Sequence, residues 1–174
     1  MEIKNVTVAG GGVLGSQIAL QSAYKGFTVT LWLRSEGSIE RTRPKLERLR
    51  GIYKASLEAL KTDPSAFCRG LTDSPDVPPA QLDELIARVD AAFDSLVLTT
   101  DVEQAFGGAD LVIEAIAEVI AEKEAFYGSI AGALPEHAVL CTNSSTLLPS
   151  AMAGFTGRPD RFLALHFANN IWKN

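Results

Sequence analysis

The sequence predicts an α/β fold in which a doubly wound, mostly parallel sheet carries helices on both faces. The first of three supporting observations is a strand-like run, residues 4–9, which leads through glycines spaced G-x-G-x-x-G into a helical pattern. The second is that strand-like and helix-like stretches alternate along most of the 174 residues. The third is the stretch 110–115 (DLVIEA), which is almost continuously apolar, as is typical of a strand buried on both faces of a parallel sheet.

Composition limits the kind of protein this can be. The chain is long enough for one domain, 47% of its residues are apolar, 21% are charged, and its formal net charge is -5. An acidic chain of this kind is not expected to bind nucleic acid or anionic membranes. It has no membrane-length apolar run and no signal-peptide layout, so we expect a cytoplasmic protein. Cys68 and Cys141 are expected to be idle thiols, and we predict no metal because no cluster of His, Cys and carboxylates has metal-site spacing.

Residues 4–33 predict a complete βαβ unit. A strand at 4–9 is followed by a helix at 13–25, which Gly26 ends as a C-cap glycine. The run 28–33 (TVTLWL) is rich in β-branched and aromatic side chains and predicts the second strand. A unit of about thirty residues has the size that a Rossmann-like dinucleotide-binding motif requires.

The three glycines of this unit have distinct roles in such a motif. Gly10 allows the tight turn, Gly12 lets bare backbone approach a diphosphate, and Gly15 lets the helix pack closely on the strand. The helix that begins at Val13 and Leu14 then offers unpaired N–H groups and its positive dipole end to the phosphates. The alternative is an ordinary strand-to-helix turn, but the flanking strand and helix favour a dinucleotide site.

The end of the second strand should decide which dinucleotide is bound. NAD-binding motifs place an acidic residue there for the ribose hydroxyls, whereas this chain has Leu33, Arg34 and Ser35. Arg34 and Ser35 could bind a 2′-phosphate by charge and by hydrogen bonding, so the pattern favours NADP over NAD. The alternative is that Arg34 is a solvated charge and Glu36 binds the ribose.

Residues 38–93 interrupt the alternation and predict an inserted helical arm. Two amphipathic helices, 38–60 and 80–93, flank a proline-rich loop, and Pro44 is expected near the start of the first helix or at a kink before it. Residues 34–54 hold seven basic and three acidic side chains. This excess is either a solvated helix face or a surface for a second phosphorylated ligand.

The second half of the chain supplies more strands of the predicted sheet and three polar clusters. The strands are expected at 96–99, 110–115, 138–141 and 161–165, with helices at 102–106, 118–133 and 149–152. Ligands of such sheets bind at the carboxyl ends of the strands. The polar clusters expected there are the glycine turn, the run 143–146 (NSST), and His166 with Asn169 and Asn170.

These clusters predict chemistry at one edge of the sheet. A strand-end histidine such as His166 can act as a general base that takes a hydroxyl proton while hydride leaves for a nicotinamide. A neighbouring hydroxyl or amide in 143–146 can hold the carbonyl oxygen in the reverse direction. The alternatives are a packed histidine and ordinary turn chemistry. His137 is expected at the surface and Cys141 in the core.

At these residues the sequence resembles the NAD-binding domain of the 3-hydroxyacyl-CoA dehydrogenases. The resemblance covers nearly the whole chain and is carried by VAGGGVLGSQIA, DLVIEAIAE followed by EKEAFY, TNSSTL and DRFLALHFAN. It implies an oxidoreductase of fatty acid metabolism that transfers hydride between a nicotinamide cofactor, NAD or NADP, and a 3-hydroxyacyl-CoA of the 3-hydroxybutyryl-CoA type.

The resemblance also assigns roles to residues of this chain. His166 would be the catalytic base, Ser145 would hydrogen-bond the substrate oxygen, and Asn169 would lie in the same site. Glu118 and Lys123 would line the ribose and nicotinamide side of the cofactor. The helical arm would help to hold CoA. The cofactor-binding set expected from motif and resemblance together is Gly10, Gly12, Val13, Leu14, Gly15, Arg34, Ser35, Glu118, Lys123 and Asn143.

Three departures from the family pattern matter. Leu33 and Arg34 replace its acidic residue, and Asn170 replaces the proline that usually follows its asparagine. The chain also stops before the family's histidine-orienting glutamate and its C-terminal helical domain, which closes over substrate and forms the homodimer. We therefore expect one dinucleotide-binding domain, residues 1–174, that binds cofactor but turns over substrate poorly or not at all. The alternatives are another β-hydroxyacid dehydrogenase and a non-catalytic dinucleotide-binding protein.

Overall fold

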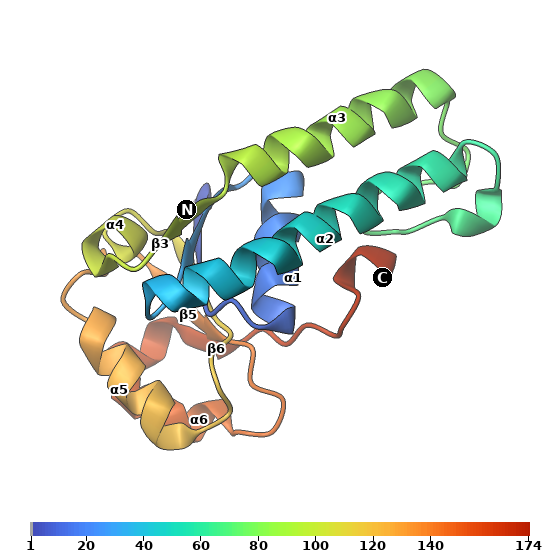
Figure 1. The fold of residues 1–174 in the computed structure, drawn as a ribbon. Helices are drawn as coiled ribbons and strands as arrows, with labels where there is room; N and C mark the ends of the chain where they lie inside the picture. Colours follow the sequence, from blue (N-terminus) through green and yellow to red (C-terminus); the bar gives the residue numbers. More distant parts are fainter. Residues whose placement is uncertain (1) are drawn as a thin grey trace.

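The computed structural model describes residues 2–174, and within them it shows one six-stranded, entirely parallel sheet (Figure 1). The strand order is β3-β2-β1-β4-β5-β6, so the chain builds outward from β1 in two directions. This confirms the predicted doubly wound α/β fold. The strands are β1 (Asn5–Ala9), β2 (Thr28–Trp32), β3 (Val97–Thr99), β4 (Leu111–Glu114), β5 (Val139–Thr142) and β6 (Phe162–Ala164).

The register brings the carboxyl ends of the strands to one edge. Ala9, the last residue of β1, pairs with Trp32 of β2 and with Glu114 of β4. Glu114 in turn pairs with Thr142, and Thr142 with Ala164. The segments that follow these strands therefore begin side by side, which is the condition for a shared site.

Helices cover both faces of the sheet, because successive residues of its central strands face opposite cores. Ile113 and Cys141 face a core formed with α1 (Val13–Tyr24), α2 (Glu36–Leu60) and α3 (Pro79–Ser95). Val112 and Leu140 face a second core formed with α4 (Val102–Phe106) and α5 (Ile120–Ile130). Burial on both sides explains why these strands are apolar at consecutive positions. The remaining helix is α6 (Pro149–Met152), and short 3₁₀ turns lie at Pro64–Ala66, Ala153–Thr156, Pro159–Arg161 and Ile171–Lys173.

The helices α2 and α3 lie side by side and pack on α1 (Figure 1). Lys54 of α2 pairs with Asp90 of α3 at 2.6 Å, and Lys61, just past α2, pairs with Asp83 at 2.5 Å. Tyr53 of α2 is fully buried. That residues 38–93 behave as a separate insertion stays a prediction.

Two of the expected helix boundaries were wrong. α2 begins at Glu36 because the Ser35 side chain caps it by accepting from the N–H of Ser38, so Pro44 lies inside the helix and not at its start. α5 begins at Ile120 and not at residue 118, because the carboxylate of Glu118 is engaged by the loop after β5.

The structure also bears on the two cysteines and on whether a helix could span a membrane. Cys68 and Cys141 are both free and buried, and burial raises the pKa of the Cys141 thiol to about 11. Among residues 2–174, no helix combines the length and apolar composition that crossing a bilayer requires.

Candidate functional site

The glycine turn has the backbone geometry that the motif requires. Gly10 has φ 109°, and a Cβ there would lie 2.6 Å from the carbonyl oxygen of Ala115. A Cβ on Gly15 would lie 1.8 Å from the carbonyl oxygen of Gly10, so only glycine lets α1 approach β1 this closely. A Cβ on Gly12, in contrast, would meet no atom of the described chain within 4 Å. Backbone atoms of the protein therefore pack closely against Gly10 and Gly15, whereas the space beside Gly12, where α1 begins, is open.

Gly11 has a role that the sequence reasoning missed. A Cβ on Gly11 would lie 2.1 Å from Thr42 Oγ1 and 2.7 Å from Leu33 Cδ2, so this glycine lets α2 pack against the turn. Lys45 of α2 donates from Nζ to the Gly11 carbonyl at 2.8 Å. The only sequence signal for this contact was the uninterrupted run of glycines at 10–12.

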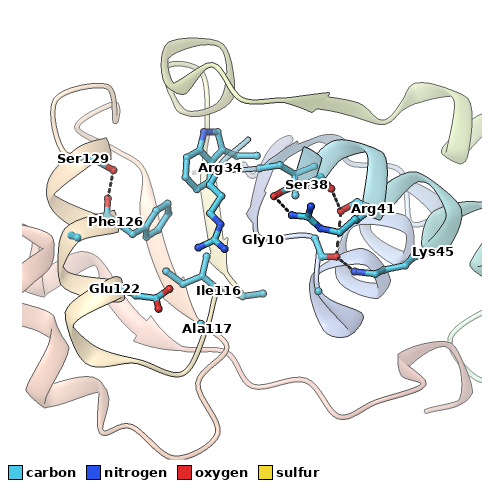
Figure 2. Close-up of a pocket in the computed structure, with 17 residues that line it drawn as sticks. Gly10, Arg34, Ser38, Arg41, Lys45, Ile116, Ala117, Glu122, Phe126 and Ser129 are labelled. Carbon is cyan, nitrogen blue, oxygen red and sulfur yellow. Dashed lines mark hydrogen bonds between the residues drawn. The ribbon is translucent and has the colours of Figure 1, made fainter. Parts of the chain in front are cut away.

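A cleft of about 660 Å³ lies beside the turn, between α2 and α5. Gly10, Gly12 and Arg34 line it, as expected for residues of a dinucleotide site. Figure 2 shows Arg34 between the α5 side of this cleft and the α2 side. Its other charged lining residues are Arg41, Lys45 and Glu122. The α2 side of the cleft is therefore positively charged.

The residues around Arg34 bear on the choice of cofactor. Arg34 is exposed in the cleft, and Arg41 donates to Ser38 Oγ at 3.0 Å. Glu36 accepts a hydrogen bond from Thr100 Oγ1 at 3.2 Å and is not among the described residues that line the cleft. Ser35 is engaged in capping α2. Beside Arg34, the α2 side of the cleft thus offers guanidinium and ammonium groups, and not the Glu36 carboxylate.

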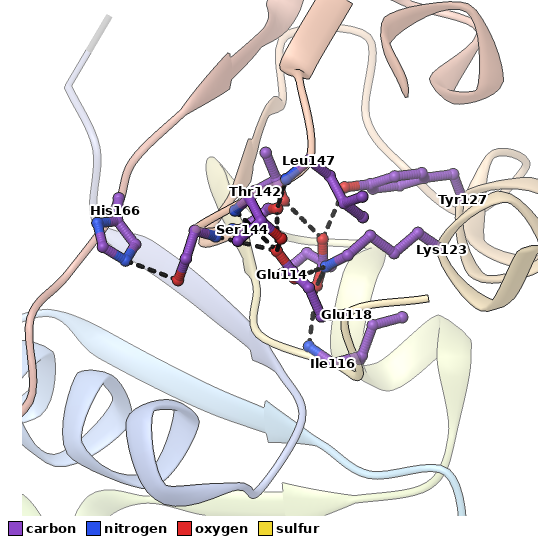
Figure 3. Close-up of polar contacts among 11 residues, drawn as sticks. Glu114, Ile116, Glu118, Lys123, Tyr127, Thr142, Ser144, Leu147 and His166 are labelled. Atoms are coloured by element: carbon purple, nitrogen blue, oxygen red, sulfur yellow. Dashed lines mark hydrogen bonds and ion pairs between the residues drawn. The ribbon is translucent and has the colours of Figure 1, made fainter. Parts of the chain in front are cut away.

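A buried polar network lies under the neighbouring strand ends (Figure 3). Glu114, at the end of β4, is 0% exposed and accepts from Lys123 Nζ at 2.6 Å, Tyr127 Oη at 3.0 Å and Thr142 Oγ1 at 2.8 Å. The N–H of Ile116 donates to the same carboxylate at 2.9 Å. Burial, reinforced by the Glu114 charge, raises the pKa of Tyr127 above its usual range. The network joins β4, α5 and β5 into one rigid unit.

Glu118 extends this network to the loop after β5. Its Oε1 accepts from Ser144 Oγ, from the N–H groups of Ser145 at 3.0 Å and Thr146 at 3.1 Å, and from Thr146 Oγ1 at 3.0 Å. Its Oε2 lies 3.5 Å from Lys123 Nζ. Partial burial alone would raise the pKa of Glu118, but these hydrogen bonds and the Lys123 charge outweigh it and lower the pKa to about 2. A charged Glu118 therefore fixes the position of Ser145.

Ser145 and His166 are brought together by this arrangement. Ser145 Oγ and His166 Nε2 lie 3.0 Å apart, although they follow different strands. Backbone anchors hold both sides of the histidine, because Leu165 N–H donates to the Thr142 carbonyl at 2.9 Å and Phe167 N–H donates to Asn143 Oδ1 at 2.8 Å. Asn143 thus engages the histidine segment through its side chain.

The loop between β4 and α5 connects the cleft to this pair. Ala115, Ile116 and Ala117 line the cleft, and Glu118, the next residue, holds the loop that carries Ser145. Asn169 is exposed in the segment after His166. Several of the expected cofactor-binding residues lie outside the lining of the cleft: Val13, Leu14, Gly15, Ser35, Glu118, Lys123 and Asn143. Lys123 is 1% exposed, so it acts in this structure through Glu114 and Glu118.

Comparisons with known proteins identify the family to which this sequence is similar. The family model of the 3-hydroxyacyl-CoA dehydrogenase NAD-binding domain matches residues 5–173. The mitochondrial hydroxyacyl-coenzyme A dehydrogenase of Homo sapiens is 30% identical over 171 residues, which cover 97% of this chain and 48% of that protein. A protein of Bacillus subtilis named probable 3-hydroxybutyryl-CoA dehydrogenase is 30% identical over 171 residues, covering 98% and 50%.

A solved structure extends the comparison. It is described as a diketoreductase with substrate-directed dual catalysis of dicarbonyl compounds, and it matches with a TM-score of 0.81 and 37% identity over 100% of this chain and 53% of its own. The chain spans about half the length of the curated relatives it matches.

Proposed function

Because this chain belongs to the 3-hydroxyacyl-CoA dehydrogenase family, whose NAD-binding domain it matches over residues 5–173, we propose that it binds a nicotinamide dinucleotide and carries the pair of side chains that handles the substrate proton. The observation that supports this most directly is the 3.0 Å contact between Ser145 Oγ and His166 Nε2, at the same sheet edge as the glycine turn. The proposed reaction is the interconversion of a hydroxyl and a carbonyl group of the substrate, as between a 3-hydroxyacyl-CoA and its 3-ketoacyl-CoA.

The residues present fit a nicotinamide dinucleotide. The N–H groups at the start of α1, next to the open backbone of Gly12, would receive the diphosphate. The adenosine half would occupy the cleft that Arg34 and Ile116 line. The nicotinamide half would extend past Glu118 toward Ser145. Gly10 supports this fit, since its φ of 109° turns the chain directly from β1 into the binding loop.

His166 transfers the substrate proton, and Ser145 binds the oxygen that loses it. In the oxidation direction His166 Nε2 takes the proton of the substrate hydroxyl, and the Ser145 hydroxyl hydrogen-bonds the same oxygen as it becomes a carbonyl. The nicotinamide, when bound, supplies the acceptor for the hydride. In reduction His166 returns the proton to the oxygen. Glu118 and Asn143 hold the two groups in place through the backbone of their segments.

The charges in the cleft favour NADP as the cofactor. Arg34, Arg41 and Lys45 line it, and Ser38 adds a hydroxyl. Guanidinium groups suit a 2′-phosphate, whereas ribose hydroxyls require an acceptor such as a carboxylate. Glu36, the acidic residue nearest to Arg34 in the sequence, accepts from Thr100 Oγ1 and is not among the described residues that line the cleft.

Two substrate classes follow from the comparisons. The relatives named hydroxyacyl-coenzyme A dehydrogenase favour an acyl-CoA, with the basic surface of α2 available to its phosphates. The diketoreductase, which is 37% identical across the chain, favours a dicarbonyl compound. Comparing turnover of a 3-ketoacyl-CoA with that of a dicarbonyl ester distinguishes the two. The homodimer and the cytoplasmic location stay predictions.

Exchanging His166 tests the proposed function. In the full-length protein, His166→Ala should lower kcat for carbonyl reduction by at least about 100-fold and leave the affinity for NADPH nearly unchanged. The fluorescence of Trp32, which lines the cleft, reports that affinity. His137→Ala is the matched control, because His137 lies at the amino ends of the strands, 3.1 Å from Asp110. Equal turnover in His166→Ala and wild type would refute the proposal.

A further inference from the structure

The backbone turns sharply at Asn170, shortly after His166. Asn170 has φ 61° and ψ 46°, which is the left-handed region. Residues other than glycine rarely adopt this backbone region, and asparagine tolerates it better than most of them. Proline, which the family resemblance leads one to expect here, has φ fixed near about -65° and cannot form this turn. The departure from the family pattern is therefore a structural feature of this chain.

Gln17 of α1 holds the turn. Its Oε1 accepts from the N–H of Asn170 at 2.8 Å and from the N–H of Ile171 at 3.4 Å. Gln17 is only 5% exposed, so its amide oxygen is largely removed from water and depends on these donors. A proline at position 170 would remove the shorter of the two hydrogen bonds as well as the turn.

The segment that follows the Asn170 turn is also held by contacts with the rest of the protein. The carbonyl of Trp172 accepts from Gly70 N–H at 3.0 Å, and the Trp172 ring lies 5.6 Å from that of Tyr53. Gln21, also on α1, donates to the Gly70 carbonyl at 2.7 Å. Figure 1 shows this last segment running from β6 to the side of α1 and α2. Asn170 is therefore held between two fixed points, the His166 segment and the Trp172 segment.

We propose that Gln17 is a positioning residue, whose hydrogen bond to the Asn170 turn sets the path of residues 167–170 and so the placement of His166 and Asn169 against the substrate. The inference rests on the proposed function, because it concerns the group that takes the proton. On the near side Asn143 fixes Phe167, and on the far side Gln17 fixes Asn170. Only Ala168 and Asn169 lie between the two fixed residues, Phe167 and Asn170.

The first test separates kcat from binding. In the full-length protein, Gln17→Leu and Asn170→Pro should each lower kcat between about 10-fold and 100-fold, because small misplacements of a catalytic group cost that much. The dissociation constant for NADPH should stay within about twofold of wild type. Asn170→Gly keeps both the N–H and the φ, so it should recover most of the kcat that Asn170→Pro loses. Unchanged kcat in Gln17→Leu and Asn170→Pro would overturn the inference.

The second test needs no turnover. The chain has two histidines, so the ring nitrogen signals of His166 can be followed by NMR with His137 as an internal reference. Gln17→Leu should shift the His166 signals and leave those of His137 in place, because His137 pairs with Asp110 at the other edge of the sheet. If wild type shows no activity, the proposed function fails while this readout still decides the positioning.

A milder substitution keeps the inference testable if Gln17→Leu or Asn170→Pro fails to fold. Asn170→Ala keeps the N–H donor and only disfavours the left-handed backbone. It should shift the His166 signals in the same direction as Gln17→Leu. Identical His166 signals in Asn170→Ala and wild type would contradict the inference.

Discussion

Replacing Lys123 by methionine is expected to lower the free energy of unfolding, because Lys123 is the counter-charge in the buried network under the site. The Lys123 side chain is 1% exposed, that of Glu114 is 0% exposed, and the two charges are 2.6 Å apart. Removing the ammonium group leaves the Glu114 carboxylate buried without a counter-charge. Breaking a buried pair in this way costs about 3–5 kcal/mol.

The hydrogen bonds that remain decide where in this range the cost falls. Glu114 keeps the donors Ile116 N–H, Tyr127 Oη and Thr142 Oγ1, so we expect the lower end, about 3 kcal/mol. For a chain of this size such a loss lowers Tm by about 6–12 °C. Urea denaturation followed by circular dichroism measures the free energy of unfolding directly.

The control for this prediction neutralises both partners. Lys123→Met combined with Glu114→Gln removes the uncompensated charge and should be more stable than Lys123→Met alone, because it is the lone buried carboxylate that destabilises the single variant. A single variant within about 1 kcal/mol of wild type, or a double variant no more stable than the single, would refute the reasoning.

Other parts of the site give predictions of their own. Arg34→Asp should weaken NADPH binding about 10-fold to 100-fold relative to NADH, since a hydrogen bond to a charged group contributes about 1.5–3 kcal/mol; equal losses for both cofactors would show that Arg34 does not bind the phosphate. Gly11→Ala should destabilise the fold by about 1–3 kcal/mol through overpacking against Thr42, whereas Gly12→Ala should leave stability nearly unchanged and weaken dinucleotide binding; thermal melts and fluorescence titrations check the pair. The Glu118 carboxyl should titrate by NMR near its pKa of about 2, and the stability it adds should be complete above its ordinary value of 4.5 and decline as the pH falls toward 2; a midpoint near 4.5 would contradict the Ser144 and Thr146 contacts.

The sequence predicted those parts of the candidate site whose positions follow from backbone topology alone. The glycine spacing predicted the turn between β1 and α1, and the parallel arrangement implied that the run 143–146 and His166 would share an edge. The register of the strands then places Glu114, Thr142 and Ala164 side by side. Polar residues that directly follow strands therefore carry positional information even without a structure.

Contacts that depend on the rotation of a helix or the path of a loop were not predictable in this way. Ser38, Arg41 and Lys45 recur at helical spacing, but the sequence does not say that this face of α2 turns toward Gly11. Glu118 was expected as the first residue of a helix, whereas its carboxylate accepts from four donors of the loop after β5. Both outcomes follow from tertiary hydrogen bonds that override local periodicity.

A crystal structure of the protein with NADPH tests the central claim most directly. The account predicts the diphosphate at the start of α1 above Gly12, the 2′-phosphate beside Arg34, and the nicotinamide ring next to Ser145 and His166. A dinucleotide bound away from the glycine turn, or a nicotinamide ring remote from His166, would contradict it.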